Sequence, residues 1–133
     1  MIFSLPGPGL KNRVRVLVVD DERNIRAALG VLLEAMGCVV RDCGSSTAAI
    51  DAVGREEFDL ALVDVRLGRE NGLDLLKYLR ACLPRLQVVV MSGETTVETV
   101  VEAMRRGATD YMIKPLVPSR LRRLVEQARR VGS

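Results

Sequence analysis

Short apolar runs alternate five times with segments whose apolar residues recur every three or four positions. The runs are rich in β-branched residues and several are apolar nearly throughout, which is typical of strands covered by helices on both faces. The predicted strands are Val14–Val19, Val39–Arg41, Leu60–Val63, Val88–Met91 and Tyr111–Ile113.

The segments between and after these strands have the helical period. Their apolar stripes occupy residues 25–36, 49–53, 73–79, 97–104 and 121–128. Gly37 and Gly107 are expected to end the first and fourth helices. The spacing of Thr95 and Glu98 predicts a capping box with Thr95 at the cap, and the last helix is expected to start near Pro118.

The alternation of five strands with five helices, joined by short connections, predicts an α/β fold: a (βα)5 doubly wound parallel sheet with the flavodoxin-like strand order 2-1-3-4-5. The length of 133 residues suits one domain. We assign residues 13–133 to it. Residues 1–12 contain Pro-Gly-Pro-Gly and no periodicity, so they are predicted to be a flexible N-terminal extension.

Composition narrows the chemistry. The chain has no histidine, which argues against hydrolases with an imidazole base and against a zinc site. A bound metal would therefore have oxygen ligands, as Mg²⁺ or Ca²⁺ prefers. The net charge of +3 is too small for nucleic-acid binding to be the first expectation. The three cysteines form no C-x-x-C pair and are expected to be free thiols in a reducing compartment.

Neither a secretory signal nor an apolar run of the ~20 residues needed to span a bilayer is visible. We therefore expect a cytoplasmic protein without a membrane partner.

Polar residues stand directly after four of the predicted strands, where open α/β sheets bind their ligands. They are Asp20 and Asp21 after the first strand, Asp64 after the third, Ser92 after the fourth and Lys114 after the fifth. Three carboxylates about 5 Å apart repel by about 3 kcal/mol per pair at an effective dielectric near 20. Together with Lys114 they sum to −3 + 1 = −2, which one Mg²⁺ would neutralise through ligands such as Asp21 and Asp64.

Such a pocket can accept a phosphoryl group. The Asp64 carboxylate would attack phosphorus to form an acyl phosphate, while Lys114 and the cation would neutralise the phosphoryl oxygens and Ser92 would donate a hydrogen bond. Each residue alone has a simpler interpretation: Asp20 or Asp21 as a helix cap, Ser92 as a turn residue, Lys114 as a surface charge. Their coincidence at four strand ends favours the joint site.

Three stretches carry a resemblance to a known family: VLVVDDERNIRAAL, LALVDVRLGRENGLDLL and VVVMSGETTVETVVEAMRRGATDYMIKPL. Over about residues 13–130 the chain resembles the receiver domain of bacterial two-component response regulators. The roles that the resemblance implies are Asp64 as phosphoacceptor, Asp20 and Asp21 with the Arg66 backbone carbonyl as Mg²⁺ site, Ser92 as switch hydroxyl, Tyr111 as aromatic switch, and Lys114, before a cis Pro115, as partner of the phosphoryl group.

The resemblance also implies partners. A sensor histidine kinase would supply the phosphoryl group, and the chain would be a phosphoacceptor that assists its own phosphorylation and dephosphorylation rather than an enzyme. The face formed by residues 93–107, Tyr111–Ile113 and the last helix would control an output domain or form a homodimer. The sequence is similar to transcription regulators of the NtrC and redox-responsive types. It ends after the last helix, so two alternatives stay open: an output domain is missing from this chain, or this is a stand-alone docking module.

Two features differ from or vary within the family pattern. Gly68 stands where proline is frequent, which predicts a loosened loop between Asp64 and Gly72. Arg66 and Glu94 stand two residues after Asp64 and Ser92, and we expect them to pair at the mouth of the pocket and to influence the lifetime of the phosphoryl bond. The alternative is two solvated side chains.

Other classes fit less well. A phosphatase of the haloacid dehalogenase type would need an acid where Arg66 stands. A flavodoxin would need a phosphate-binding loop after the first strand, where Asp20-Asp21-Glu22 would repel a phosphate. The arginines of the last helix are interleaved with Glu126 and an apolar stripe, which indicates a solvated face rather than a nucleic-acid contact.

Overall fold

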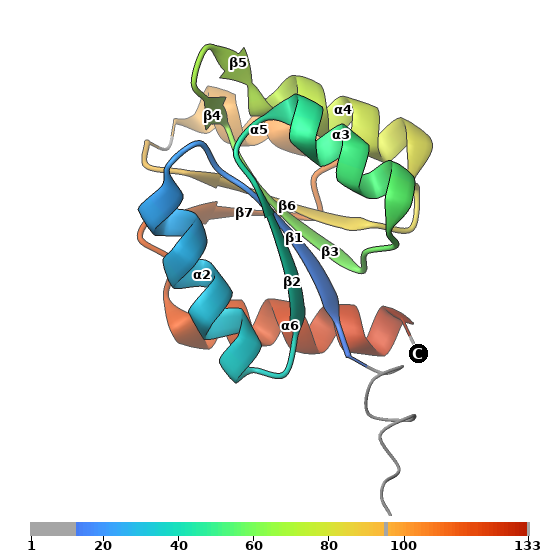
Figure 1. Ribbon diagram of the computed structural model, residues 1–133. Coiled ribbons are helices and arrows are strands. Elements are labelled where there is room, and N and C mark those ends of the chain that lie inside the picture. The colour runs from blue at the N-terminus through green and yellow to red at the C-terminus, as the bar shows by residue number, and fades with distance from the viewer. Residues whose placement is uncertain (1–12, 95, 133) are drawn as a thin grey trace, which may run out of the picture.

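A five-stranded parallel sheet lies between two layers of helices (Figure 1). The fold is that of a computed structural model, which describes residues 13–94 and 96–132. The expected extension, residues 1–12, lies outside the described residues. The strands of the sheet are β1 (Arg15–Val19), β2 (Val39–Cys43), β3 (Leu60–Asp64), β6 (Gln87–Ser92) and β7 (Asp110–Ile113). Their spatial order β2-β1-β3-β6-β7 confirms the predicted order 2-1-3-4-5.

Helices cover both faces of the sheet. Figure 1 shows helices on both sides of the sheet, which is the doubly wound arrangement. The first face carries α2 (Arg23–Ala35) and α6 (Pro118–Gly132), and the second carries α3 (Ser46–Arg55), α4 (Gly72–Cys82) and α5 (Val97–Arg105). Each described helix coincides with one of the predicted apolar stripes.

The central strands supply both cores because successive side chains of a strand point to opposite faces. Val16 and Val18 of β1 pack in the core under α2 and α6, whereas Leu17 and Val19 pack in the core under α3, α4 and α5. All four side chains are fully buried. Burial on both faces explains why these strands are apolar nearly throughout.

Strand β2 is longer than predicted. It extends to Cys43 because its parallel pairing with β1 continues as far as Val19 opposite Cys43. Arg41 and Asp42 are exposed at this edge of the sheet, and their polarity concealed the end of the strand from an analysis of hydrophobic pattern.

The loop after Asp64 is a short antiparallel hairpin, which the sequence analysis did not predict. Strands β4 (Arg66–Leu67) and β5 (Glu70–Asn71) pair with each other. Gly68 lies in the connection with φ +61°, a backbone conformation that glycine adopts without steric strain. Glycine here permits the tight turn of the hairpin, and the loosened loop that Gly68 predicts remains a prediction.

Helix α5 begins one residue later than the capping box indicated. Its N-cap is Thr96, whose side chain accepts a hydrogen bond from the Thr99 N–H. Thr95, the expected cap, lies outside the described residues. Among the described residues, no helix has the length and apolar character required to cross a bilayer.

Candidate functional site

The parallel register of the sheet brings the predicted site residues to one edge. Val19 lies opposite Val63, so the next residues, Asp20 and Asp64, are level with each other at the carboxyl ends of β1 and β3. Ser92 ends β6 opposite Ile113 of β7, directly before Lys114. The side chains of Asp20, Asp64 and Ser92 are the buried polar groups of the described chain.

Lys114 joins the two buried carboxylates. Its Nζ lies 2.6 Å from Asp20 Oδ2 and 2.6 Å from Asp64 Oδ2. The exposed fractions of these side chains are 15% for Lys114, 0% for Asp20 and 8% for Asp64. Burial disfavours the Lys114 ammonium, but its hydrogen bonds with Asp20 and Asp64 outweigh burial and raise the pKa of Lys114 above its usual value. The lysine is therefore a fixed positive charge in the pocket, and its peptide bond to Pro115 is cis as the resemblance implied.

Hydrogen bonds restrain both the side chain and the backbone carbonyl of Asp20. Its Oδ1 accepts a hydrogen bond from the Glu22 N–H at 2.8 Å, and its carbonyl oxygen accepts one from Arg26 Nη1 at 2.7 Å. Arg26 also pairs with Asp42 of β2 at 2.9 Å. The N-cap of α2 is Glu22, so the alternative that Asp20 or Asp21 caps this helix is wrong.

Asp64 is buried at the carboxyl end of β3. Its Oδ1 accepts a hydrogen bond from the Arg66 N–H at 3.1 Å. Burial is the main influence and raises the pKa of Asp64, while the hydrogen bonds from Lys114 and Arg66 act in the opposite direction.

Gly72 is a site residue that the sequence analysis named only as the end of a loop. A Cβ built on Gly72 would overlap the backbone carbonyl oxygen of Asp64. The Gly72 N–H donates a hydrogen bond to the Val65 carbonyl oxygen at 2.6 Å. Only glycine allows the start of α4 to lie this close to the backbone of Asp64. The signal in the sequence was weak, because glycine before a helix is common in loops.

Asp21 completes a cluster of carboxylates at the edge of the sheet. Asp20, Asp21 and Asp64 each offer an oxygen, and these oxygens lie within 4.8 Å of one another. Asp21 is exposed whereas the other two are buried. Three hard oxygen donors, with a local charge of −3 + 1 = −2 once Lys114 is included, fit a divalent cation such as Mg²⁺ or Ca²⁺.

The predicted switch residues lie in the same region, and their side chains form hydrogen bonds with the backbone of Glu94. Ser92 Oγ donates a hydrogen bond to the Glu94 carbonyl oxygen at 2.6 Å and accepts one from the Glu94 N–H at 3.1 Å. Tyr111 Oη donates to the same Glu94 carbonyl oxygen at 3.2 Å. Ser92 and Tyr111 thus share one acceptor on the loop that precedes α5.

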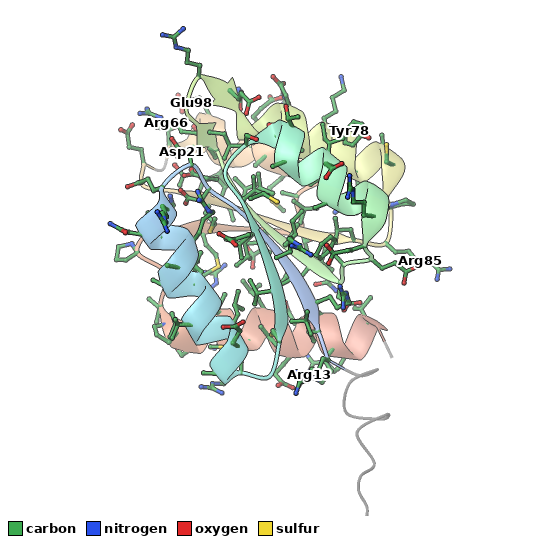
Figure 2. The ribbon with its side chains drawn as sticks, viewed as in Figure 1. Arg13, Asp21, Arg66, Tyr78, Arg85 and Glu98 are labelled. Atoms are coloured by element: carbon green, nitrogen blue, oxygen red, sulfur yellow. The ribbon has the colours of Figure 1, made fainter. Side chains whose placement is uncertain are left out.

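Arg66 and Glu94 form the expected pair at the rim. Arg66 Nη2 lies 3.4 Å from Glu94 Oε2, and the two side chains are 77% and 75% exposed. Figure 2 shows Arg66 and Asp21 at the edge of the molecule, above the first turn of α2 in this view. The pair exists, but its length and exposure make it a weak contact in water.

The doubly wound parallel sheet, with three carboxylates and a lysine at its carboxyl edge, places the protein in the class of α/β domains with an acidic site at the ends of the strands. Comparison with known sequences gives the family: the sequence model "Response regulator receiver domain" matches residues 16–126. This chain belongs to the receiver domains of two-component response regulators.

Relatives support this assignment. The alginate biosynthesis transcriptional regulatory protein AlgB of Pseudomonas aeruginosa is 41% identical over 108 residues, which are 81% of this chain and 24% of AlgB. The chain thus spans about a quarter of the length of the curated relatives it matches. Among solved structures, NtrX from Brucella abortus is 34% identical with a TM-score of 0.82, covering 90% of this chain and 27% of NtrX.

One similar structure has a phosphorylated aspartate. A response regulator protein from Burkholderia pseudomallei, solved with a phosphorylated aspartic acid, a calcium ion and citrate, is 30% identical with a TM-score of 0.78. The match covers 81% of this chain and 64% of that chain.

Proposed function

We propose that Asp64 accepts a phosphoryl group from the phosphohistidine of a sensor kinase, and that Mg²⁺ bound by Asp20, Asp21, Asp64 and the Arg66 backbone carbonyl assists this transfer. The observation that carries the proposal is the placement of Lys114 Nζ at 2.6 Å from both buried carboxylates, beside an exposed third one. This arrangement offers a nucleophile together with a fixed positive charge for the incoming phosphoryl oxygens.

The transfer forms one bond and breaks one. A carboxylate oxygen of Asp64 attacks phosphorus, and the bond between phosphorus and the kinase imidazole breaks with its electron pair returning to the nitrogen. Lys114 moves no proton in this step and donates hydrogen bonds to the phosphoryl oxygens. The cation supplies further positive charge at those oxygens and so lowers the repulsion between anions.

Phosphorylation changes the hydrogen-bond partners available to Ser92. The phosphoryl group replaces about one negative charge by about two, and its oxygens are stronger acceptors than the Glu94 carbonyl. When Ser92 Oγ donates to the phosphoryl group, the Glu94 carbonyl keeps Tyr111 as its side-chain donor. A shift from 1:99 to 99:1 between two loop conformations requires about 5.5 kcal/mol, which two charge-assisted hydrogen bonds and repacking of Tyr111 can approach.

The loop leads directly into α5, so the face formed by α5, β7 and α6 is the proposed output surface. Exposed apolar side chains lie on it: Val97, Met104, Ile113 and Val117. Several charges of this face are already paired within the chain, Arg106 with Glu102 at 2.6 Å and Arg120 with Asp110 at 2.9 Å. The apolar side chains are therefore the better basis for a homodimer or for contact with an output domain.

We further propose that the receiver regulates transcription, because AlgB and the similar protein ZraR are transcriptional regulatory proteins. The three free cysteines suit a reducing compartment, which supports a place in the cytoplasm. An alternative function is docking of a partner without phosphorylation, which the exposed apolar face would also permit.

Intact mass after incubation with acetyl phosphate and Mg²⁺ tests the proposal. We expect a single phosphoryl adduct on the wild-type chain, dependent on Mg²⁺ and absent from Asp64→Asn. Asp51→Asn, which changes an exposed aspartate of α3, is the matched control and should retain the adduct. A folded wild-type chain that forms no adduct would contradict the proposal and favour the docking function.

A further inference from the structure

The three carboxylates of the cluster are restrained by different partners. Lys114 holds Asp20 and Asp64. Asp21 is exposed, and its Oδ2 accepts a hydrogen bond from the Gly68 N–H at 3.0 Å, from a residue 47 positions away. Among residues 13–94 and 96–132, the Asp21 carboxylate accepts this one hydrogen bond, so its Oδ1 has no hydrogen-bond partner there.

The donor belongs to an anchored hairpin. Leu67, next to Gly68, is buried in the core under α3 and α4 with 2% exposure. On the other strand, Glu70 Oε1 accepts a hydrogen bond from the Ser46 N–H at 3.0 Å, and the Asn71 side chain caps α4 by accepting from the Leu73 N–H at 2.8 Å. The Gly68 N–H is therefore fixed to the core, to α3 and to α4 at once.

Residue identity at this position decides whether the donor exists. Gly68 has φ +61°, which a proline ring, fixed near −65°, does not allow. Proline also has no N–H. The departure of this chain from the proline that the family pattern led us to expect thus creates a donor aimed at one of the three cluster carboxylates.

We propose that Gly68 is a positioning residue for the divalent cation: its N–H fixes one oxygen of Asp21 and presents the other to the metal. This inference rests on the proposed function, since it assumes that Asp21 is a ligand. An exposed aspartate without this bond would have to give up rotamer freedom when the cation binds, and that ordering weakens binding. The hydrogen bond orders the carboxylate before the metal arrives.

Removal of the single N–H is the direct test. A semisynthetic chain with an ester in place of the peptide bond between Leu67 and Gly68 loses the donor and keeps the glycine, and the all-amide semisynthetic chain is its control. We expect the ester to weaken Mg²⁺ binding roughly three- to tenfold, the range for ordering one side chain. Unchanged Mg²⁺ affinity in the ester chain would overturn the inference.

Ordinary variants give a second comparison. Gly68→Pro removes the donor, whereas Gly68→Asn keeps it and tolerates a positive φ. A Cβ at position 68 would have only Asp21 Oδ2 near it, at 4.0 Å, so the asparagine variant has room. We expect Mg²⁺ affinity to fall in Gly68→Pro and to stay within about twofold of wild type in Gly68→Asn.

Amide hydrogen exchange reads the contact without metal. In the Mg²⁺-free wild-type chain the Gly68 N–H should exchange more slowly than in Asp21→Ala, and equal rates would overturn the inference. Mg²⁺ binding and phosphorylation of the wild-type chain separate this inference from the proposed function. A wild-type chain that fails to bind Mg²⁺ overturns the proposed function and this inference together, whereas normal Mg²⁺ binding and phosphorylation with an indifferent Gly68 overturn the inference alone.

Discussion

Two groups of contacts between opposite charges belong to the same site, and they differ in their exposure to water. Lys114 lies between Asp20 and Asp64, and these three side chains, which we call the floor of the site, are 15% exposed or less. Arg66 and Glu94 meet at the rim, where both side chains are about three-quarters exposed. Floor contacts are 2.6 Å long and the rim contact is 3.4 Å long.

The difference shows where electrostatics shapes this domain. Water and dissolved salt screen the rim pair, so its contribution to stability is expected to be at most about 1 kcal/mol. The floor charges are shielded from solvent, so removing the lysine leaves the two carboxylates uncompensated. The floor therefore determines stability and chemistry, while the rim can adjust rates of access without much effect on the fold.

The largest expected effect is on the floor lysine. Lys114→Met should lower the free energy of unfolding by about 3 kcal/mol in EDTA, because two buried carboxylates lose their counter-charge. Urea denaturation measures this, and Lys77→Met, which changes an exposed lysine of α4, is the control. Equal losses in the two variants would contradict a special role for the floor charge.

Metal removal is the next test, because a cation that binds only the folded cluster stabilises it. We expect Mg²⁺ at ten to a hundred times its dissociation constant to raise the free energy of unfolding by about 1.4 to 2.7 kcal/mol relative to EDTA. Asp21→Ala should lose most of this gain while it keeps the Lys114 contacts. A wild-type chain whose denaturation curve ignores Mg²⁺ would speak against a metal site here.

Removal of a floor carboxylate should change the free energy of unfolding in the opposite direction from removal of the lysine. Asp64→Asn reduces the local negative charge from −2 to −1 and keeps an oxygen that can accept a hydrogen bond from Lys114. In metal-free buffer we expect the free energy of unfolding to rise by about 1 kcal/mol. The same urea titration decides the sign, and a loss as large as that of Lys114→Met would show that the floor is a balanced ion pair rather than an excess of negative charge.

Rim variants should have the smallest effect on stability. We expect the coupling between Arg66→Ala and Glu94→Ala to be below about 1 kcal/mol in a double-mutant cycle and to shrink at high salt. If the pair guards the pocket mouth, each variant should nevertheless change the rate at which the phosphorylated chain loses its adduct. Rates equal to wild type in both variants would leave the pair as two solvated side chains.

Most of the fold was predictable because its signals are local. The five strands and five helices follow from apolar periodicity, and the tight connections indicate a parallel sheet with helices on both faces. What the pattern missed were features without such a signal: the end of β2 at Asp42 and Cys43, and the hairpin at Arg66–Asn71. There, backbone pairing with a neighbour decides the structure.

The sequence by itself determined which residues stand at the ends of the strands, because the positions of Asp20, Asp64, Ser92 and Lys114 follow from the period of the strands before them. Only the tertiary structure decided how they are connected. The Lys114 contacts bridge 94 and 50 residues of sequence, and the Gly68 contact with Asp21 bridges 47. Such contacts depend on the register of neighbouring strands and on the direction of single backbone groups, which periodicity does not record.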